Sequence, residues 1–283
     1  MPYCLIFPGQ GSQFTGMSKG LALDGAVDGA LRTLMEKGPD DELWQTVNAQ
    51  PAVLFVSMAL WERSGLKDPA AVIGHSLGEY TALVAAGSIP LHKAMDLVKN
   101  RARFMDASRP KGTGGMAAVI GMSRHEIEDV IAGIGELWVA NLNGASQVVI
   151  SGSTRSIDAA APLLKERGAR RVVPLKVSVA SHCPYMDNAR GSLRDYLGSV
   201  EIKAPLCPLI ANVSARPETD PDRIKELLAE QLVKPVRFEE SVLSAAGLGI
   251  DRFIELGPRS VLAPLIKRIV PSAKVEAITN DGH

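Results

Sequence analysis

The stretch that decides the fold reads Ala71-Val72-Ile73-Gly74-His75-Ser76-Leu77-Gly78-Glu79-Tyr80-Thr81-Ala82-Leu83-Val84-Ala85-Ala86. Its first three residues form an apolar run that predicts a buried strand, and residues 79–86 predict a helix. Between them, Gly74 and Gly78 bracket Ser76 in the pattern G-x-S-x-G, which is typical of a strained turn that holds a nucleophilic hydroxyl at the positive end of a helix. A plain turn with a helix-capping serine fits the same five residues, so the choice depends on the rest of the chain.

The same order of strand, glycine-rich turn and helix is expected at the N-terminus after Leu5-Ile6-Phe7. Apolar runs alternate with helix-period segments along the whole chain, without an internal repeat, as in α/β proteins. The middle of the chain follows the order βαββαβ, with elements expected at residues 116–120, 124–134, 137–140, 147–151, 157–167 and 171–177. We therefore expect an α/β fold in which an α/β-hydrolase-like large domain, residues 1–110 and 187–283, carries an inserted ferredoxin-like small domain, residues 111–186.

The composition argues against several classes of partner. Lys and Arg total 31 and Asp and Glu total 31, so no net charge draws the chain to nucleic acid or to an anionic membrane. The N-terminus lacks the pattern of a signal peptide, and no stretch is long enough to span a bilayer. Cys4, Cys183 and Cys207 are scattered, without the close pairing that a zinc site or a disulfide framework needs. We therefore expect a cytoplasmic protein without a metal site.

A serine nucleophile needs a base, and the chain contains five histidines. Four of them are set aside. His283 ends the chain, and His92 and His125 lie at the polar starts of expected helices. His75 adjoins the serine, and its side chain should point away from it. His182 remains, where the chain returns from the insert to the large domain, and a cleft between the domains would place it opposite Ser76. A histidine that only bonds a loop fits this position too. Because no acidic partner motif stands out, we predict a Ser–His dyad whose histidine is oriented by a group other than a carboxylate, such as a backbone carbonyl.

Arg101 occupies the apolar face of a helix expected from Leu91 to Ala107. An unpaired buried charge is costly, so Arg101 must either extend to water or meet an anion. Arg103 lies on the polar side of the same helix and serves as a surface comparison.

Three motifs follow one another in the order Gly9-Gln10-Gly11-Ser12-Gln13, Gly74-His75-Ser76-Leu77-Gly78-Glu79-Tyr80 and Ser181-His182-Cys183. Further blocks are Gln50-Pro51-Ala52, Arg101 with Phe104-Met105, Asn141-Leu142-Asn143, Pro235-Val236-Arg237 and Glu255-Leu256-Gly257-Pro258. Together these motifs resemble the malonyl-CoA:acyl carrier protein transacylase family, and the resemblance covers nearly the whole chain.

Carried over residue by residue, the resemblance implies that Ser76 forms the acyl-enzyme and that His182 relays the proton. The backbone N–H groups of Gln10 and Leu77 would form the oxyanion hole. The main-chain carbonyl of Gln231 would orient His182, which would account for the missing acid.

The resemblance also implies that Arg101 pairs with the free carboxylate of malonate. Asn143 would border the substrate pocket, although a turn role fits this residue equally well. The implied reaction is a ping-pong transfer from malonyl-CoA to the phosphopantetheine thiol of an acyl carrier protein, in fatty acid or polyketide synthesis. It implies no cofactor, since coenzyme A enters as the thioester substrate.

Other functions remain open at this point. A serine hydrolase or thioesterase would use the same serine and histidine but would let water release the acyl group. A module that only binds a carrier protein, without catalysis, would need neither the serine nor the histidine. Val179-Ala180-Ser181 lacks the bulky aromatic residue that some malonyl-selective polyketide enzymes carry before the histidine, so a methylmalonyl-selective acyltransferase is a further alternative.

Overall fold

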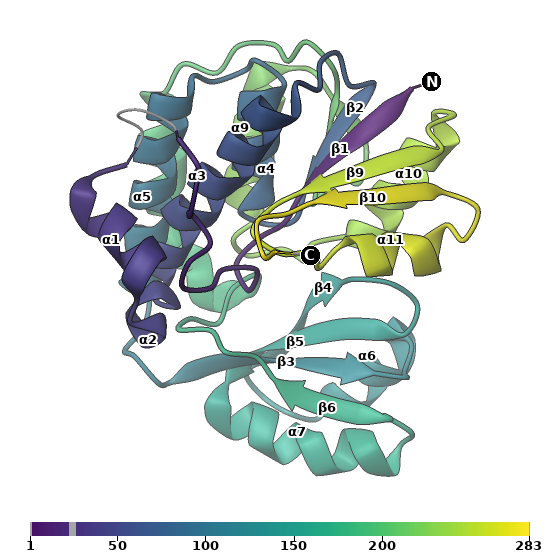
Figure 1. Ribbon diagram of the computed structural model, residues 1–283. Coiled ribbons are helices and arrows are strands. Elements are labelled where there is room, and N and C mark those ends of the chain that lie inside the picture. Colours follow the sequence, from purple (N-terminus) through teal and green to yellow (C-terminus); the bar gives the residue numbers. More distant parts are fainter. Residues whose placement is uncertain (1, 23–26, 283) are drawn as a thin grey trace.

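The computed structural model describes residues 2–22 and 27–282, which form two β-sheets with helices packed around them (Figure 1). Within these residues the larger sheet has the strand order β10-β9-β1-β2-β7-β8. Its strands are β1 (Tyr3–Phe7), β2 (Ala71–Gly74), β7 (Leu209–Ile210), β8 (Pro217–Glu218), β9 (Arg252–Leu256) and β10 (Lys274–Ile278). Neighbouring strands are parallel except for β7 and β8. The prediction of an α/β fold is confirmed.

Both faces of the larger sheet are buried. Successive side chains along its strands point to opposite sides, and each side packs into its own apolar cluster. In β1, Leu5 and Phe7 belong to one apolar cluster, whereas Cys4 and Ile6 belong to a second. The first cluster includes side chains from α1 (Gly29–Lys37), α2 (Asp40–Leu43), α3 (Thr46–Ser64), α4 (Gly78–Ala85), α5 (Leu91–Asp106), the 3-10 turn η1 (Pro184–Met186), α8 (Asp187–Gly198) and α9 (Pro221–Glu230). The second includes α10 (Phe238–Gly247) and α11 (Ala263–Ile269).

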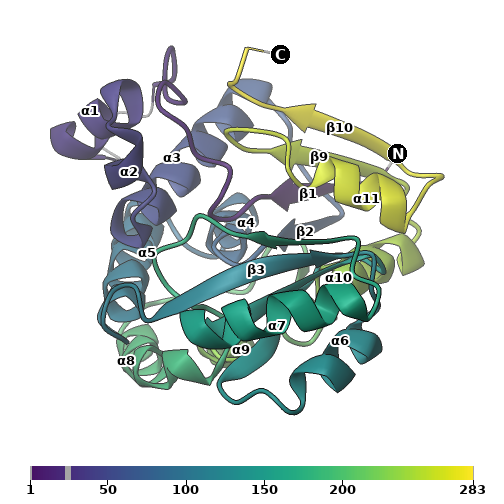
Figure 2. The same ribbon diagram turned by 90° about the horizontal axis from the view of Figure 1, so that it is seen from below.

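The smaller sheet is antiparallel, with the strand order β4-β5-β3-β6. Its strands are β3 (Gly114–Ile120), β4 (Leu137–Leu142), β5 (Gln147–Ser153) and β6 (Arg171–Pro174). Two helices, α6 (Arg124–Ile131) and α7 (Thr154–Glu166), pack on the face that points away from the larger sheet (Figures 1 and 2). The opposite face carries Met116, Ala118 and Val149, which line a cavity between the two sheets. The order of elements along the middle of the chain is therefore the predicted βαββαβ.

One strand prediction was wrong in length. The last strand of the insert was expected to reach Val177, but β6 ends at Pro174. The Leu175 N–H still donates to the Met116 carbonyl at 2.9 Å. Beyond that bond the chain leaves the sheet edge, because Leu175, Val177 and Val179 turn to line the cavity.

Backbone hydrogen bonds at the end of β4 join the smaller sheet to the segment that precedes α10. The Leu142 N–H donates to the Val236 carbonyl at 2.8 Å, and the Val236 N–H donates to the Ala140 carbonyl at 2.9 Å. This junction fixes the smaller sheet over the carboxyl ends of β1 and β2, where α/β proteins place their sites. In the parts of the chain that the structure describes, no helix is long and apolar enough to cross a membrane.

Candidate active site

Ser76 lies on a sharp turn between β2 and α4, as the sequence predicted. Its φ angle is 53°, a left-handed conformation that non-glycine residues rarely adopt. The flanking glycines are required by close packing: a Cβ on Gly74 would lie 1.9 Å from the carbonyl carbon of Gly78, and one on Gly78 would lie 2.0 Å from the Phe7 carbonyl oxygen. The serine side chain does not cap α4, which has no side-chain cap hydrogen bond. The hydroxyl instead projects into the cavity.

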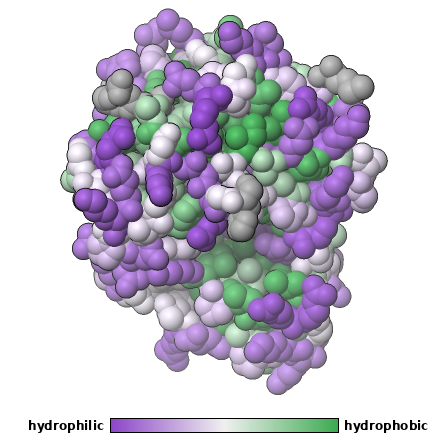
Figure 3. Space-filling model, viewed as in Figure 1, coloured by the Kyte–Doolittle hydropathy of each residue, from purple (hydrophilic) through white to green (hydrophobic). Residues whose placement is uncertain are grey.

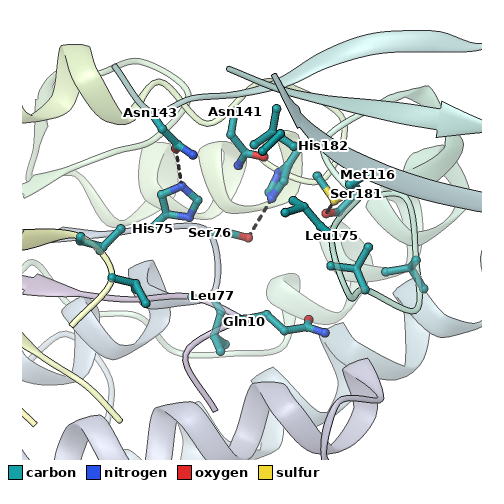
Figure 4. Close-up of a pocket in the computed structure, with 18 of the residues that line it drawn as sticks. Gln10, His75, Ser76, Leu77, Met116, Asn141, Asn143, Leu175, Ser181 and His182 are labelled. Carbon is teal, nitrogen blue, oxygen red and sulfur yellow. Dashed lines mark hydrogen bonds between the residues drawn. The ribbon is translucent and has the colours of Figure 1, made fainter. Parts of the chain in front are cut away.

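His182 approaches Ser76 from the loop that follows the smaller sheet (Figure 4). Its Nε2 lies 2.9 Å from Ser76 Oγ, and its Nδ1 lies 2.7 Å from the main-chain oxygen of Gln231. Because a carbonyl oxygen only accepts hydrogen bonds, Nδ1 carries the proton and Nε2 is left to accept the serine hydroxyl. The side chain is 3% exposed, and burial lowers the pKa of His182 to about 3. The structure thus places a neutral imidazole between the serine hydroxyl, which contacts its Nε2, and the Gln231 carbonyl, which contacts its Nδ1.

Arg101 is 1% exposed and does not extend to water. Its Nη1 donates to Gln50 Oε1 at 2.6 Å, and its Nη2 lies 2.9 Å from Gln231 Oε1 and 3.2 Å from Ser76 Oγ. The guanidinium also lies over the Tyr80 ring, 5.3 Å from its centre. Within residues 2–22 and 27–282 its direct hydrogen-bond partners are all neutral, so the site contains a buried cation beside the serine. Arg103, in contrast, is exposed on the same helix.

Gln10 and Leu77 border the cavity on the side opposite His182 (Figure 4). The Gln10 side chain is fixed by Thr46, whose hydroxyl donates to Gln10 Oε1 at 3.0 Å. Neither the Gln10 nor the Leu77 backbone N–H donates a hydrogen bond to another part of the described chain. Both amides therefore remain available to an oxygen atom in the cavity.

Asn143 and His75 close another wall of the cavity. Asn143 Oδ1 lies 2.8 Å from His75 Nε2, so the pair connects the loop after β4 with the turn after β2 (Figure 4). His75 points away from the serine, as predicted, but it also borders the cavity, which its position in the sequence did not indicate. Burial lowers the pKa of His75, which keeps the ring neutral as a donor to the Asn143 oxygen.

The cavity that unites these groups has a volume of about 290 Å³. Apolar side chains gather at the hollow between the two parts of the molecule (Figure 3). Its lining combines apolar side chains such as Met105, Met116 and Val149 with the polar side chains of Ser76, His182 and Arg101. Among the described residues, no group of three His, Cys, Asp or Glu side chains is arranged to hold a metal ion.

Residues 4–280 match the Acyl transferase domain family. The chain belongs to this family. It is 40% identical to the malonyl CoA-acyl carrier protein transacylase of Bacillus subtilis (strain 168), over 97% of this chain and 92% of the relative. An acyl carrier protein S-malonyltransferase from Vibrio cholerae superposes with a TM-score of 0.91 at 41% identity, over 99% and 97% of the two chains. A type II PKS malonyl-transacylase, solved in complex with its acyl-carrier protein, superposes with a TM-score of 0.93 at 37% identity, over 99% and 96%. The resemblance drawn from the motifs is confirmed.

Sequence reasoning missed part of this acyl transferase domain. Glu79, Asn212 and the side-chain amide of Gln231 form a buried polar cluster behind Ser76. Asn212 Oδ1 accepts the Ser76 N–H at 2.7 Å. Glu79 follows the G-x-S-x-G motif directly, but an acidic residue in the first turn of a helix is common and usually solvated. Asn212 lies outside the motifs recognised in the sequence.

Proposed function

We propose that this chain transfers a malonyl group from malonyl-CoA to the phosphopantetheine thiol of an acyl carrier protein, through an acyl-enzyme on Ser76. The observation that carries the proposal is the position of Arg101, whose Nη2 lies 3.2 Å from Ser76 Oγ in the cavity that also holds His182. A buried cation beside the nucleophile suits an acyl group that carries its own carboxylate. The named activities of the relatives support the same substrate and the same carrier.

In the first half-reaction His182 Nε2 accepts the hydroxyl proton while Ser76 Oγ attacks the thioester carbon. The backbone N–H groups of Gln10 and Leu77 stabilise the oxyanion that forms on the thioester oxygen. The carbon–sulfur bond then breaks, and the coenzyme A sulfur takes the proton from His182. The Gln231 carbonyl stabilises the imidazolium between these two steps by accepting a hydrogen bond from its Nδ1–H group.

The second half-reaction runs in reverse with a new thiol. The phosphopantetheine thiol gives its proton to His182 and its sulfur attacks the malonyl carbonyl. The ester bond to Ser76 breaks, and Oγ recovers the proton. Throughout both steps the malonate carboxylate pairs with Arg101, and Asn143 borders the acyl pocket.

This chemistry needs the two parts of the molecule together. We assign residues 1–110 and 187–283 to an α/β-hydrolase-like large domain, supported by the turn after β2 that presents Ser76. We assign residues 111–186 to a ferredoxin-like small domain, supported by the order of β3 to β6 with α6 and α7. The large domain supplies the serine and Arg101, and His182 stands on the loop that returns from the small one. We also propose the cytoplasm as the setting, supported by the three cysteines, all of which are free.

Intact-mass measurement tests the proposal. The parent protein should gain one malonyl group from malonyl-CoA and lose it when a carrier protein with a phosphopantetheine thiol is added. Ser76→Ala should gain none, because it lacks the covalent route. Loss of the adduct without carrier protein would indicate a hydrolase, and a persistent adduct on Ser76→Ala would remove Ser76 from the mechanism. Methylmalonyl-CoA in parallel reactions determines which acyl group the pocket prefers.

A further inference from the structure

Glu79 is a buried carboxyl group that the proposed steps leave unused. It lies in the first turn of α4 and is 1% exposed. One oxygen accepts the backbone N–H of Asn212 at 2.5 Å, and the other accepts the side-chain Nε2 of Gln231. Burial raises the pKa of Glu79 to about 8, against the lowering by these two donors and by Arg101. Such a group is costly to bury, so its partners indicate what it does.

Both partners of Glu79 also hold the backbone of Ser76. Asn212 Oδ1 accepts the Ser76 N–H at 2.7 Å, and Gln231 Nε2 donates to the Ser76 carbonyl at 2.9 Å. The left-handed conformation of Ser76 is unfavourable for a serine and persists only where the surroundings fix it on several sides. Glu79 bonds to both of these supports, which also meet each other through a longer contact of 3.4 Å between Gln231 Nε2 and Asn212 Oδ1.

Glu79 also determines which way the Gln231 amide points. Nε2 of Gln231 faces the acceptors of Glu79 and Ser76, so Oε1 is left to face Arg101, whose Nη2 lies 2.9 Å away. If the amide turned over, its NH₂ group would face the guanidinium, and two donors would meet. The Gln231 amide therefore joins a carboxyl group on one side to a cation on the other.

We propose that Glu79 is a positioning residue for malonyl transfer, which acts through the amides of Gln231 and Asn212 to fix the Ser76 turn and to aim Arg101 at the acyl group. The inference rests on the proposed function, because it assigns Arg101 to the malonate carboxylate. A residue that only supported the turn would affect all acyl groups alike. A residue that also aims Arg101 affects malonyl more than acetyl.

The substitution Glu79→Gln separates these roles at constant size. The backbone N–H of Asn212 cannot turn over, so the new amide must keep its oxygen there and present its NH₂ group to Gln231. Gln231 then has to turn its own amide, which sets its NH₂ group against Arg101. Rates of Ser76 acylation by malonyl-CoA and by acetyl-CoA, without carrier protein, should show malonyl falling about ten- to hundredfold, the effect of losing one hydrogen bond to a charged group. The acetyl rate should fall less, so that the malonyl-to-acetyl ratio drops about tenfold.

Glu255→Gln is the matched control. Glu255 is equally buried and accepts N–H groups of Val261, Leu262 and Ala263, but it has no hydrogen bond to Ser76, Gln231 or Arg101. This variant should melt at a lower temperature and keep the ratio of the parent.

Gln231→Met provides a second test should Glu79→Gln fail to fold, since it removes the same amide and keeps the main-chain carbonyl at His182. The ratio should fall in this variant as well. An unchanged ratio in folded Glu79→Gln, or in Gln231→Met where the first variant does not fold, overturns the inference. A parent protein that forms no malonyl adduct on Ser76 would instead contradict the proposed function.

Discussion

Replacing Arg101 by Ala should lower malonyl transfer strongly and leave the transfer of uncharged acyl groups intact. The guanidinium is 1% exposed and lies 3.2 Å from the Ser76 hydroxyl. A malonyl group attached to that hydroxyl brings its distal carboxylate into the same buried region. In Arg101→Ala this carboxylate would stand without a partner in a cavity of about 290 Å³ with largely apolar walls.

The size of the effect follows from this burial. Breaking a buried ion pair by removing one partner costs about 3–5 kcal/mol, which corresponds to a loss of roughly a hundredfold to a few thousandfold in malonyl transfer. The substitution also removes the donors to Gln50 Oε1 and Gln231 Oε1. Water that enters the vacated space can satisfy these oxygens, and any remaining cost affects every acyl group equally. This common cost therefore cancels in the ratio of the malonyl and acetyl rate constants.

The assay is the ratio of second-order rate constants for malonyl-CoA and acetyl-CoA, with one carrier protein held constant. Acetyl-CoA lacks the distal carboxylate, so Arg101→Ala should transfer acetyl as well as the parent or better. Arg103→Ala is the control on the same helix, since that side chain is exposed and lies outside the catalytic cavity. It should leave the ratio unchanged.

An equal loss for both substrates would refute the reasoning. In that case Arg101 would support the Ser76 turn or the binding of coenzyme A, and malonyl selectivity would have to come from other groups in the cavity. A reduced ratio in Arg103→Ala would refute it too, because a surface charge would then account for the preference.

Further predictions concern the base and the carrier protein. His182→Ala should slow both half-reactions by about two to four orders of magnitude in single-turnover assays, since one base serves acylation and release; normal turnover would place the base elsewhere. Because burial lowers the pKa of His182 to about 3, parent acylation should show no inflection near the ordinary histidine value of about 6.5. Below pH 6.5 the unfolded chain binds a proton at His182 and the folded chain does not. This group should therefore lower the free energy of unfolding as the pH falls from 6.5 towards 3. The melting temperature of His182→Ala should fall less over the same pH range than that of the parent. Reversing the charge of an exposed basic cluster at the edge of the smaller sheet should reduce both the on-rate of an acidic carrier protein and the salt dependence of that rate. The rate of acylation by malonyl-CoA, measured by stopped flow, should stay constant. Carrier kinetics equal to those of the parent would show that the cluster does not take part in docking. The cluster comprises Lys165, Arg167, Arg170 and Arg171.

The features that could be predicted from the sequence are those set by local geometry. The turn at Ser76 follows from two glycines that no larger residue can replace, so the motif carries its own structural requirement. Arg101 stood out because a charge on an apolar stripe of a helix needs an explanation. His182 was reached by setting aside the other four histidines, which works only because the chain has so few.

The features that could not be predicted depend on contacts between distant segments. Asn212 meets Glu79 across 133 positions of the chain, and nothing near either residue indicates that meeting. The carbonyl that orients His182 belongs to Gln231, and a backbone carbonyl leaves no trace in residue type, so this contact came only from the family resemblance. The strand at 171–174 was predicted too long because the apolar residues after it face a cavity rather than a sheet neighbour. Periodicity cannot distinguish these two kinds of burial.

The placement of the Gln231 amide between the buried groups Glu79 and Arg101 is better explained by substrate binding than by the stability of the free protein. A direct ion pair between Glu79 and Arg101 would satisfy both groups, yet the Gln231 amide stands between them. A direct pair would occupy the guanidinium with a resident carboxylate, and a malonate carboxylate would have to displace it. Because its direct acceptors in the described part of the chain are neutral oxygens, Arg101 keeps its orientation and can exchange a weak partner for a strong one when the acyl group binds. The burial of this incompletely compensated cation thus lowers the stability of the free protein. Binding of the substrate carboxylate offsets that cost. The charge of the acyl group, rather than its shape, should therefore determine which substrate the site selects.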